Sequence, residues 1–416
     1  MSNSLREIPK SEHGIARKAI GSNALKVIGR LQEAGFAAYV VGGGPRDLLL
    51  GQSPKDFDVS TGATPEEIRN LFRNARLIGR RFRLAHIRFG REIIEVATFR
   101  GSSEEGDREL DGGRLLRDNV FGSEAEDAVR RDFTINALMY DPSTEKLRDY
   151  VDGFTDIRNR RLRLIGDPVT RFREDPVRLL RAVRFVTKLN LSMDPATAGP
   201  VVQMAPLLAD IPPPRLLEEL LKLLLAGHAW PGYQRMAQLG LWQQLFPDLI
   251  PDPESPPELV KQALLNTDER VARDKPVTPG FLFAALFWLV VKRRADELLA
   301  AGAAPVEALA RAGEEAFTRH TGRVSIHRRF STMAKEIWMF QPRFERRYGK
   351  RAMRLLSERR FRAAYDFLVL RGLEDPELSD LVDWWTRVQE VDQQTREQMI
   401  FETGRKKPPP RTRPRP

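Results

Sequence analysis

Short apolar runs and amphipathic stretches divide the chain into a mixed first part and a helical remainder. Alternating or continuous apolar runs predict strands, and a repeat of about 3.6 residues predicts helices. From about residue 165, helical periodicity dominates to about residue 395. We therefore predict an α+β fold in which a mixed sheet with helices precedes an all-helical region. The first part has strand-like runs at 37–41, 56–60, 84–89 and 93–99, and helical periodicity at 23–35 and 65–72.

Polar and proline-rich segments separate these elements. The polar, glycine-bearing stretch 101–114 predicts a mobile loop. Proline clusters at 211–214 and 251–257 divide the helical region into sub-blocks. With 416 residues the chain is too long for one ordinary core, so we expect roughly two to four domains.

Hydropathy and cysteine content narrow the class of protein. The strongest apolar run, 281–291, is far shorter than the roughly 20 residues that span a bilayer, so it predicts a buried core helix. The charged N-terminus lacks the apolar core of a secretory signal. The absence of cysteine excludes disulfides, zinc–thiolate sites and thiol nucleophiles. We expect a cytoplasmic protein without a membrane span.

Basic residues are concentrated in two places, and the net charge is +11. The C-terminal stretch 405–416 contains six basic residues and no acid among prolines, which predicts a disordered arm. A solvated tail without a partner is one interpretation, and an electrostatic tether for a polyanion is the other. Residues 69–91 contain eight arginines and no acid. The RNA-binding candidates from both places are Arg80, Arg81, Arg83, Arg405, Lys406, Lys407, Arg411, Arg413 and Arg415.

Two aspartates one residue apart, Asp56 and Asp58, follow a glycine triplet. Alternate residues of a strand face the same side, so both carboxylates face one way while Phe57 faces the core. Neighbouring acids repel unless a cation lies between them, and oxygen ligands suit Mg²⁺ or Mn²⁺. Gly43 and Gly44 allow backbone N–H groups to approach a phosphate. The set predicts a site for a nucleoside triphosphate and a metal ion.

Each part of this set also has an ordinary explanation. A lone D-x-D is usually a solvated strand end, and a lone glycine triplet is usually a turn. The dinucleotide-binding fingerprint is excluded because Asp47 stands where its third glycine belongs, and no G-x-x-x-x-G-K-[ST] loop occurs. The ordered set of apolar strand, glycines and acid–apolar–acid strand is what supports the functional interpretation.

A second cluster, 130–138, combines basic, acidic and amide groups. An acid beside arginines is most often a structural ion pair. A site with a D-x-D metal pair needs a third carboxylate, and Asp132 is one candidate, with Arg131 on phosphate and Asn136 on the sugar. Glu95, on the strand 92–98, competes for the same role on geometric grounds.

A third cluster begins at Glu174 and Asp175 and continues into a helix opened by Pro176. Glu174, Arg178 and Arg181 fall at i, i+4 and i+7, along one predicted stripe. The stripe is either a surface ion-pair ladder or a set of hydrogen-bonding groups for the edge of a base.

The next segment, 214–224, predicts an amphipathic helix opened by proline. Here we favour a structural role. We expect Arg215 and Glu219, which are four residues apart, to brace the preceding helix.

With these elements in order, the chain resembles the class II nucleotidyltransferases, which comprise CCA-adding tRNA enzymes and bacterial poly(A) polymerases. Specific motifs cover about the first 230 residues: the G-G-x-x-R-D and D-x-D set, R-R-D-x-x-x-N-A, E-D-x-x-R and the following R/E helix. The segment 77–87, the segment 362–366 and the basic tail are similar to the poly(A) polymerase branch.

The resemblance implies a polymerase-β-like nucleotidyltransferase head, followed by an elongated helical neck, body and C-terminal region. It implies an N-terminal extension at 1–22, a head at 23–155, a neck with base-recognition and RNA-binding elements at 156–235, a body and RNA-binding region at 236–395, and a tail at 396–416. It favours Asp132 over Glu95 as the further catalytic acid beside the metal ligands Asp56 and Asp58. The implied nucleotide-binding residues are Gly43, Gly44, Arg46, Asp47, Arg131, Asn136, Glu174, Asp175, Arg178 and Arg181.

The activity implied by the resemblance is template-independent addition of AMP from ATP to RNA 3′ ends. The implied cofactor is Mg²⁺ or Mn²⁺, and the implied partners are RNA 3′ ends, ATP and proteins of RNA decay. A CCA-adding tRNA enzyme is the nearest alternative. A non-catalytic RNA-binding protein is an alternative of another class, although it would have no reason to keep three carboxylates.

Overall fold

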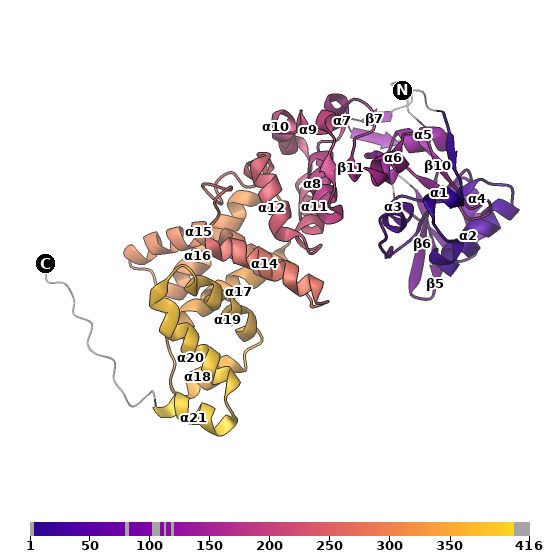
Figure 1. Ribbon diagram of the computed structural model, residues 1–416. Coiled ribbons are helices and arrows are strands. Elements are labelled where there is room, and N and C mark those ends of the chain that lie inside the picture. The colour runs from indigo at the N-terminus through magenta and orange to yellow at the C-terminus, as the bar shows by residue number, and fades with distance from the viewer. Residues whose placement is uncertain (1–3, 80–82, 102–108, 112–113, 118–119, 403–416) are drawn as a thin grey trace. The chain divides into compact units, whose positions relative to one another are not determined.

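The computed structural model describes residues 4–79, 83–101, 109–111, 114–117 and 120–402 (Figure 1). The chain forms two compact units. The N-terminal unit comprises residues 1–178 and 189–201, and the helical unit comprises residues 179–188 and 202–416.

An eight-stranded mixed sheet forms the centre of the N-terminal unit, in the order β1-β10-β9-β2-β3-β6-β5-β4. In this sheet β3 and β6 pair in parallel, and the other neighbouring strands pair antiparallel. The strands are β1 (Arg6–Ile8), β2 (Ala38–Val41), β3 (Asp58–Thr61), β4 (Ala75–Ile78), β5 (Leu84–Phe89), β6 (Glu92–Thr98), β9 (Met139–Asp141) and β10 (Lys146–Asp149). Two smaller sheets pair β7 (Glu109–Asp111) with β8 (Arg114–Arg117), and β11 (Arg161–Leu162) with β12 (Ser192–Met193).

Burial along the central strands follows their position in the sheet. Every residue of β2 is buried, as expected for an interior strand covered on both faces. In β6, Ile94 and Val96 are buried while Glu95 between them is exposed. This alternation leaves one face of the β5–β6 hairpin open beside β3, and that face holds the candidate site.

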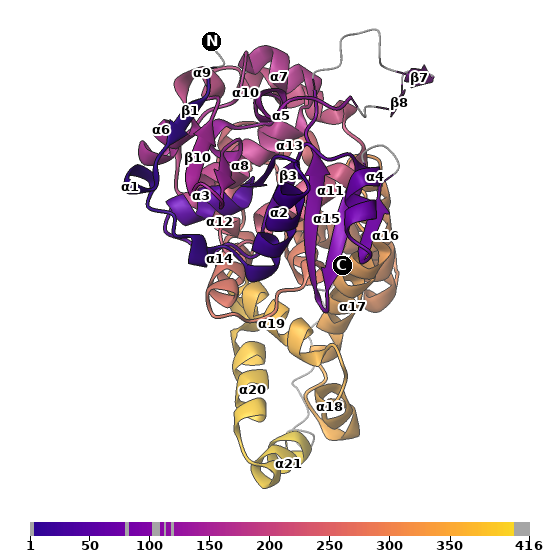
Figure 2. The same cartoon turned by 90° about the vertical axis from the view of Figure 1, so that its right-hand side faces the viewer.

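Short helices cover the sheet and carry the remaining candidate residues. Helix α2 lies against β2, β3 and β6, and α4 lies against β4 and β5 (Figure 2). A capping box between Thr64 and Glu67 starts α4. The helices of this unit are α1 (Lys10–His13), η1 (Arg17–Ala19), α2 (Ser22–Glu33), α3 (Gly43–Leu49), α4 (Pro65–Leu71), α5 (Glu124–Val129), η2 (Thr134–Asn136), α6 (Gly153–Arg158), α7 (Pro168–Glu174) and α9 (Pro195–Ala198).

Most of the predicted elements are confirmed, with small shifts at their ends. The strand predicted at 84–89 coincides with β5, whereas the strand predicted at 56–60 begins at Asp58, so Asp56 lies in the loop before it. The loop predicted at 101–114 is wrong for 109–111 and for residue 114, which belong to the β7–β8 hairpin. Within that stretch, 102–108 and 112–113 lie outside the described residues.

A buried aspartate anchors the turn that follows the second candidate cluster. Asp156 of α6 is 1% exposed and accepts a hydrogen bond from the Thr134 hydroxyl at 2.7 Å. The guanidinium of Arg163 donates to the same carboxylate oxygen at 2.7 Å, and that of Arg161 lies 3.3 Å from the other. Because Thr134 begins η2, this carboxylate fixes the backbone just after Arg131 and Asp132.

The helical unit has an aromatic core built around one long helix. Phe287 of α15 stacks on Phe317 at 4.7 Å, and the Trp338 indole donates to the Ala284 carbonyl at 3.1 Å. The core helix predicted at 281–291 is therefore confirmed. The helices are α8 (Val177–Leu189, which begins in the N-terminal unit), α10 (Val201–Met204), η3 (Ala205–Asp210), α11 (Pro213–Leu224), α12 (Ala229–Gln238), α13 (Leu241–Leu245), α14 (Glu258–Ala272), α15 (Pro279–Ala300), α16 (Pro305–Thr321), α17 (Arg328–Phe344), α18 (Gly349–Leu356), α19 (Phe361–Gly372), η4 (Pro376–Leu378), α20 (Ser379–Glu390) and α21 (Gln393–Glu402).

None of the helices in the described part of the chain combines the length and apolar character that crossing a membrane requires.

Replacing Asp156 tests whether this carboxylate supports the fold of the N-terminal unit. We expect Asp156→Ala to destabilise this unit by about 2–3 kcal/mol, because the buried hydroxyl and the guanidinium groups lose their acceptor. All six tryptophans lie in the helical unit, so hydrogen exchange at the amides of residues 133–140 is the suitable measurement. Asp152→Asn is the control, because the Asp152 side chain is 68% exposed and lies 3.9 Å from Arg163. Equal exchange in the two variants would contradict the prediction.

Candidate active site

The two acids of the D-x-D motif lie at the start of β3, beside the end of β2. Val41 pairs with Asp58 across the two strands. Phe57 turns away from the acids and packs under Gly44, where a Cβ would approach its ring to 3.1 Å. Phe57 and the Asp58 carboxylate therefore contact different glycines of the turn, and the predicted common direction of the two carboxylates stays a prediction, because Asp56 lies in the loop before β3.

Gly42, which the sequence reasoning left out of the site, forms the sharpest part of the β2–α3 turn. Its φ of 69° and ψ of −124° are accessible to glycine and strained for other residues. A Cβ built on Gly42 would lie 3.7 Å from both the Asp58 Oδ2 and the Arg131 Nη1 atoms. This turn, an acid of the motif and an arginine thus meet at one point. In the sequence, the only feature that could have assigned Gly42 to the site is its position directly after the apolar strand.

The strand register brings a third carboxylate to the same face. Val59 pairs in parallel with Val96, and both side chains are buried, so Asp58 and Glu95, one residue earlier in each strand, face together away from the core. Glu95 of β6 in turn pairs with His86 of the neighbouring strand β5. The His86 Nε2 atom lies 3.3 Å from the Glu95 Oε1 atom.

Burial of the carboxylate and the charges of neighbouring acids both act on Asp58. Its side chain remains in part open to solvent, but nearby protein atoms desolvate the carboxylate. This desolvation, together with the charges of Asp56 and Glu95, raises the pKa of Asp58 to about 6, and the opposing effect of Arg131 is smaller. Clustered acids of this kind are unfavourable for the protein alone and are typical of sites that bind a cation.

Arg131 is held in place by three different groups. Its Nη2 donates to Asp127 at 2.9 Å and to the Ser60 hydroxyl at 3.1 Å, and its Nη1 donates to the Asn136 carbonyl at 3.3 Å. The guanidinium is 21% exposed. It is therefore a fixed positive charge next to Asp58, and its predicted contact with phosphate stays a prediction.

Three of the predicted nucleotide-binding residues and the predicted catalytic acid Asp132 form one connected network. The buried Arg46 donates to Asp47 at 2.8 Å and to the Asn136 Oδ1 at 2.7 Å. The Asn136 amide donates to the Asp132 Oδ1 at 3.0 Å, and the same oxygen accepts from the Phe133 N–H at 2.8 Å. This network ties α3 to the turn η2. The roles predicted for these residues on a nucleotide remain predictions.

The predicted base-recognition residues surround Glu174, where two helices meet. Glu174 ends α7, while Arg178 lies in α8, so the continuous helical stripe that we predicted is wrong. The ion pair between Glu174 and Arg178 nevertheless forms, at 3.2 Å. The Asp175 backbone, with φ of −150°, makes the break, and the Asp175 carbonyl accepts from the Arg178 N–H.

Arg171, which the sequence reasoning missed, connects this junction to the second candidate cluster. Its guanidinium contacts Glu174 at 2.8 Å and donates to the carbonyls of Arg130 and Arg131 at 2.8 and 2.6 Å. Burial and the nearby Arg178 charge lower the pKa of Arg171. In the sequence, the spacing of three residues between Arg171 and Glu174 could have predicted their ion pair. Only the fold shows the contacts with the two carbonyls.

Arg181 belongs to the helical unit, where a buried glutamate binds it. Glu219 is 6% exposed, and it lies 3.4 Å from Arg181 and 3.2 Å from Arg184, both in α8. Helix α11 thus braces α8 through Glu219, as predicted. Lys222 of α11 also lies 3.3 Å from Glu219, and the part predicted for Arg215 in this brace stays a prediction.

Only one of the predicted RNA-binding residues is described by the structure. Arg83 is exposed and pairs with Glu66 of α4 at 2.7 Å. The other candidates lie outside the described residues: Arg80, Arg81, Arg405, Lys406, Lys407, Arg411, Arg413 and Arg415.

The donor set fits a magnesium-type ion. Among the described residues, no three or more histidine, aspartate and glutamate side chains are grouped so that they could hold a metal ion by themselves. Mg²⁺ commonly uses one or two carboxylates and completes its coordination with water and substrate phosphates. The desolvated Asp58, with Asp56 beside it, matches that pattern.

Comparison with known proteins agrees with this geometry. Residues 38–163 match the family model described as the poly A polymerase head domain. Residues 190–252 match the probable RNA and SrmB-binding site of polymerase A, and residues 301–416 match the polymerase A arginine-rich C-terminus. Poly(A) polymerase I of Salmonella typhi is 48% identical, over 98% of this chain and 91% of that protein. The chain belongs to the bacterial poly(A) polymerase family.

More distant relatives are CCA-adding enzymes. That of Levilactobacillus brevis is 39% identical, over 53% of this chain and 54% of its own length. The crystal structure of the Bacillus stearothermophilus CCA-adding enzyme in complex with CTP has a TM-score of 0.57 and 26% identity. That alignment covers 88% of this chain and 82% of the solved chain, so the nucleotidyltransferase fold is confirmed.

The raised pKa of Asp58 predicts an unusual effect of removing its charge. The folded protein binds this proton more tightly than an unfolded chain with a pKa of 3.8, so the stability that Asp58 contributes is lost as the pH rises through about 6. We therefore expect metal-free Asp58→Asn to melt at a higher temperature than the unmodified protein at about pH 7, and at a similar temperature near pH 4. Differential scanning calorimetry in EDTA measures this.

Added Mg²⁺ should stabilise the unmodified protein and leave Asp58→Asn unaffected, because ligand binding to the folded state raises its stability. Glu33→Gln is the control, since it removes an exposed acid of α2. A melting temperature of metal-free Asp58→Asn that is lower at about pH 7 would contradict the assigned repulsion.

Proposed function

We propose that this chain adds AMP from ATP to RNA 3′ ends without a template, with release of pyrophosphate. The observation that carries the proposal is the desolvated Asp58 with Asp56 beside it, next to the β2–α3 turn, in a chain that aligns over nearly its whole length with poly(A) polymerase I. Family membership makes the chain a polynucleotide adenylyltransferase. The nucleotide, the metal ion and the residue roles below are our proposals.

Asp56 and Asp58 would hold the metal ions, whose chemistry when bound would be to lower the pKa of the attacking 3′-hydroxyl and to neutralise charge on the triphosphate. The residues around them position the reactants. The open turn at Gly42 and Gly43 gives phosphate oxygens access to backbone N–H groups. The fixed guanidinium of Arg131 opposes the raised pKa of Asp58 and would contact the incoming phosphates. The hydroxyl displaces pyrophosphate in line, without a covalent enzyme intermediate.

Glu95 is better placed than Asp132 to be the third acid at the metal pair. The carboxylate of Glu95 shares a face with Asp58 and contributes to its raised pKa. The Asp132 carboxylate instead accepts hydrogen bonds from the Asn136 amide and the Phe133 N–H. We assign Glu95 the role beside the metal ions, and Asp132 the positioning of Asn136 and, through it, of Arg46.

Adenine selection would come from the junction of α7 and α8. Glu174 and Asp175 offer acceptors for an amino group, and Arg178 offers donors for ring nitrogens. A site with fixed hydrogen-bonding groups rejects a wrong base because buried groups are left unpaired. Arg171 transmits this geometry to the metal site through the Arg130 and Arg131 carbonyls.

A CCA-adding activity is less well supported. The CCA-adding relative aligns with about half of the chain, whereas the poly(A) polymerase relative aligns with nearly all of it.

The RNA would be held without sequence preference, by Arg83 and by the basic stretches outside the described residues.

A primer-extension assay tests the proposed function. We expect ATP with Mg²⁺ to give a long ladder on an unstructured RNA and on a tRNA that lacks its CCA end. Asp56→Ala and Asp58→Ala should abolish extension while RNA binding is retained, because the metal ligands are removed. Growth of the tRNA by only C, C and A would instead assign the chain to the CCA-adding branch. Full activity of both variants would overturn the metal assignment.

Paired amide substitutions separate the two candidates for the third acid. We expect Glu95→Gln to lower kcat by roughly a hundredfold and to raise the Mg²⁺ concentration required, because a negative charge next to the ions is removed. Asp132→Asn should have a small effect, since an amide oxygen can still accept from Asn136 and Phe133. Steady-state kinetics at several Mg²⁺ concentrations measures both effects. The reverse order of effects would assign the catalytic role to Asp132.

A further inference from the structure

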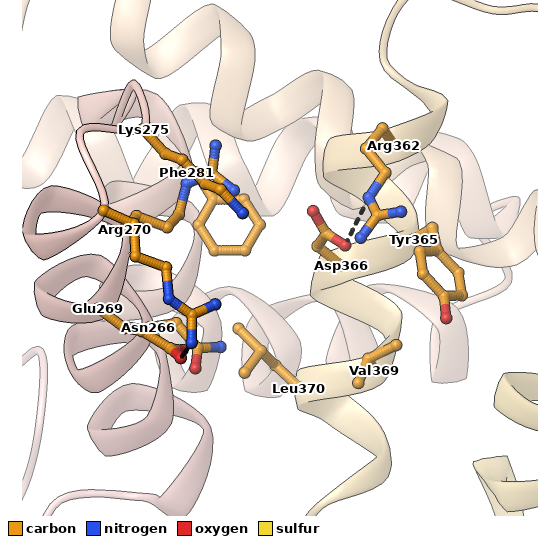
Figure 3. Close-up of a pocket in the computed structure, with 11 residues that line it drawn as sticks. Asn266, Glu269, Arg270, Lys275, Phe281, Arg362, Tyr365, Asp366, Val369 and Leu370 are labelled. Atoms are coloured by element: carbon orange, nitrogen blue, oxygen red, sulfur yellow. Dashed lines mark ion pairs between the residues drawn. The ribbon is translucent and has the colours of Figure 1, made fainter. Parts of the chain in front are cut away.

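A cavity of about 350 Å³ lies in the helical unit, within a region of the chain that the catalytic proposal does not use. Its walls come from the end of α14, the loop that follows, the start of α15 and one face of α19 (Figure 3). Two groups of residues matter for its chemistry. They are the cations Arg270, Arg273, Lys275 and Arg362, and the potential base contacts Asn266, Phe281 and Asp366. Glu269 also lines the cavity and forms an ion pair with Arg273 at 2.5 Å.

The cavity has positive charge that the protein does not neutralise. Arg270 donates through Nη2 and Nε to the Pro276 carbonyl, at 2.9 and 3.2 Å, so its partner is a neutral group. Lys275 is exposed, and no described residue forms an ion pair with it. The Arg362 guanidinium, by contrast, pairs with Asp366 at 2.9 Å. An anionic ligand would therefore find two available cations on the α14 side.

The remaining walls can contact a base. The half-buried Phe281 packs edge-on against Phe367 at 6.4 Å and also lines the cavity. Asn266 accepts a hydrogen bond from the Gln262 amide at 2.8 Å, which leaves its own amide N–H groups as donors. Asp366 lies across the cavity on α19 (Figure 3) and can accept from an exocyclic amino group.

The opposite wall contains a packed aromatic side chain. The Tyr365 hydroxyl is 2.7 Å from the Thr386 hydroxyl of α20, and the Arg362 guanidinium lies 5.3 Å from the centre of the Tyr365 ring. Tyr365 is itself 7% exposed, whereas the Arg362 side chain is exposed. Tyr365 thus gives the α19 side of the cavity a fixed surface.

We propose that this cavity binds a nucleotide of single-stranded RNA, with the base beside Phe281 and Asn266 and the adjoining phosphates at Arg270 and Lys275. Single-strand sites combine unneutralised cations with aromatic rings in this way. An acidic peptide would use the cations but not the aromatic and amide contacts. The proposal rests on the proposed function, because the bound strand would be RNA that the enzyme extends, held by a different unit from the one that carries the catalytic residues.

RNA binding by matched variants tests the proposal without catalysis. We compare the full-length protein with the double variant Arg270→Gln/Lys275→Gln by fluorescence anisotropy, using a labelled oligoadenylate in EDTA. The glutamine amide introduced at position 270 can still donate to the Pro276 carbonyl, so the loop is kept. Lys350→Gln of α18 is the control, because Lys350 is exposed and has no ion pair with a described residue. Thermal melting confirms that each variant is folded.

We expect the double variant to raise the Kd several-fold and to reduce the salt slope by roughly 0.7 for each phosphate that is no longer bound. Lys350→Gln should change neither quantity as much. Photo-crosslinking of RNA that carries 4-thiouridine, followed by mass spectrometry, should label Phe281 or its neighbours. Equal Kd values and slopes for the double variant and the control would overturn the proposal, and so would competition by oligoglutamate as strong as that by RNA.

Failure of this inference can be told from failure of the proposed function. If the unmodified protein extends RNA with ATP but its RNA binding is insensitive to Arg270 and Lys275, only the cavity assignment is wrong. If the variants weaken RNA binding but no nucleotide is incorporated, the cavity binds RNA and the catalytic proposal is wrong.

Discussion

The repulsion among Asp56, Asp58 and Glu95 is the constraint on which the N-terminal unit depends. Parallel pairing of β3 with β6 places Asp58 and Glu95 on one face, and the Gly42 turn brings Arg131 within reach of Asp58. Desolvation of the carboxylate and the charges of Asp56 and Glu95 together raise the pKa of Asp58 to about 6, and Arg131 offsets this only in part. Under the proposed function, cations and phosphates bound here would relieve the repulsion, and the stability lost in the free protein would become binding energy for the substrate complex.

The polar residues behind the acids act as one framework. Arg131 contacts Asp127, Ser60 and the Asn136 carbonyl, while Asn136 connects Asp132 to Arg46. Arg171 joins the same segment to Glu174 at the junction of α7 and α8. A change at Glu174 would therefore reach the acids Asp56 and Asp58 through hydrogen-bonded groups. These hydrogen bonds hold together three motifs that are far apart in the sequence: the G-G-x-x-R-D turn, the segment 130–138 and the segment that begins at Glu174.

Several roles could not be assigned from motifs because they depend on partners that are distant in the sequence. Glu174 and Arg178 are spaced as if on one helix, but a break at Asp175 puts them on two, and their ion pair forms across it. Arg181 fits the same spacing, yet its described partner is the buried Glu219 of α11. Asp132 and Glu95 were both candidates for the third acid, and strand register, which a single sequence does not reveal, separates their surroundings.

Local patterns by themselves determined the order of elements and the identity of the acid pair. Alternation predicted β5, the apolar run predicted the core of α15, and the spacing of glycines and aspartates predicted the nucleotide site. These features depend on neighbouring residues, whose periodicity the chain displays directly. Only the tertiary structure decided the placement of Glu95 beside Asp58, the part of Gly42 and Arg171 in the site, and the cavity between α14 and α19. Each of these features forms where two segments that are distant in the sequence come together. No local sequence pattern predicts such a contact.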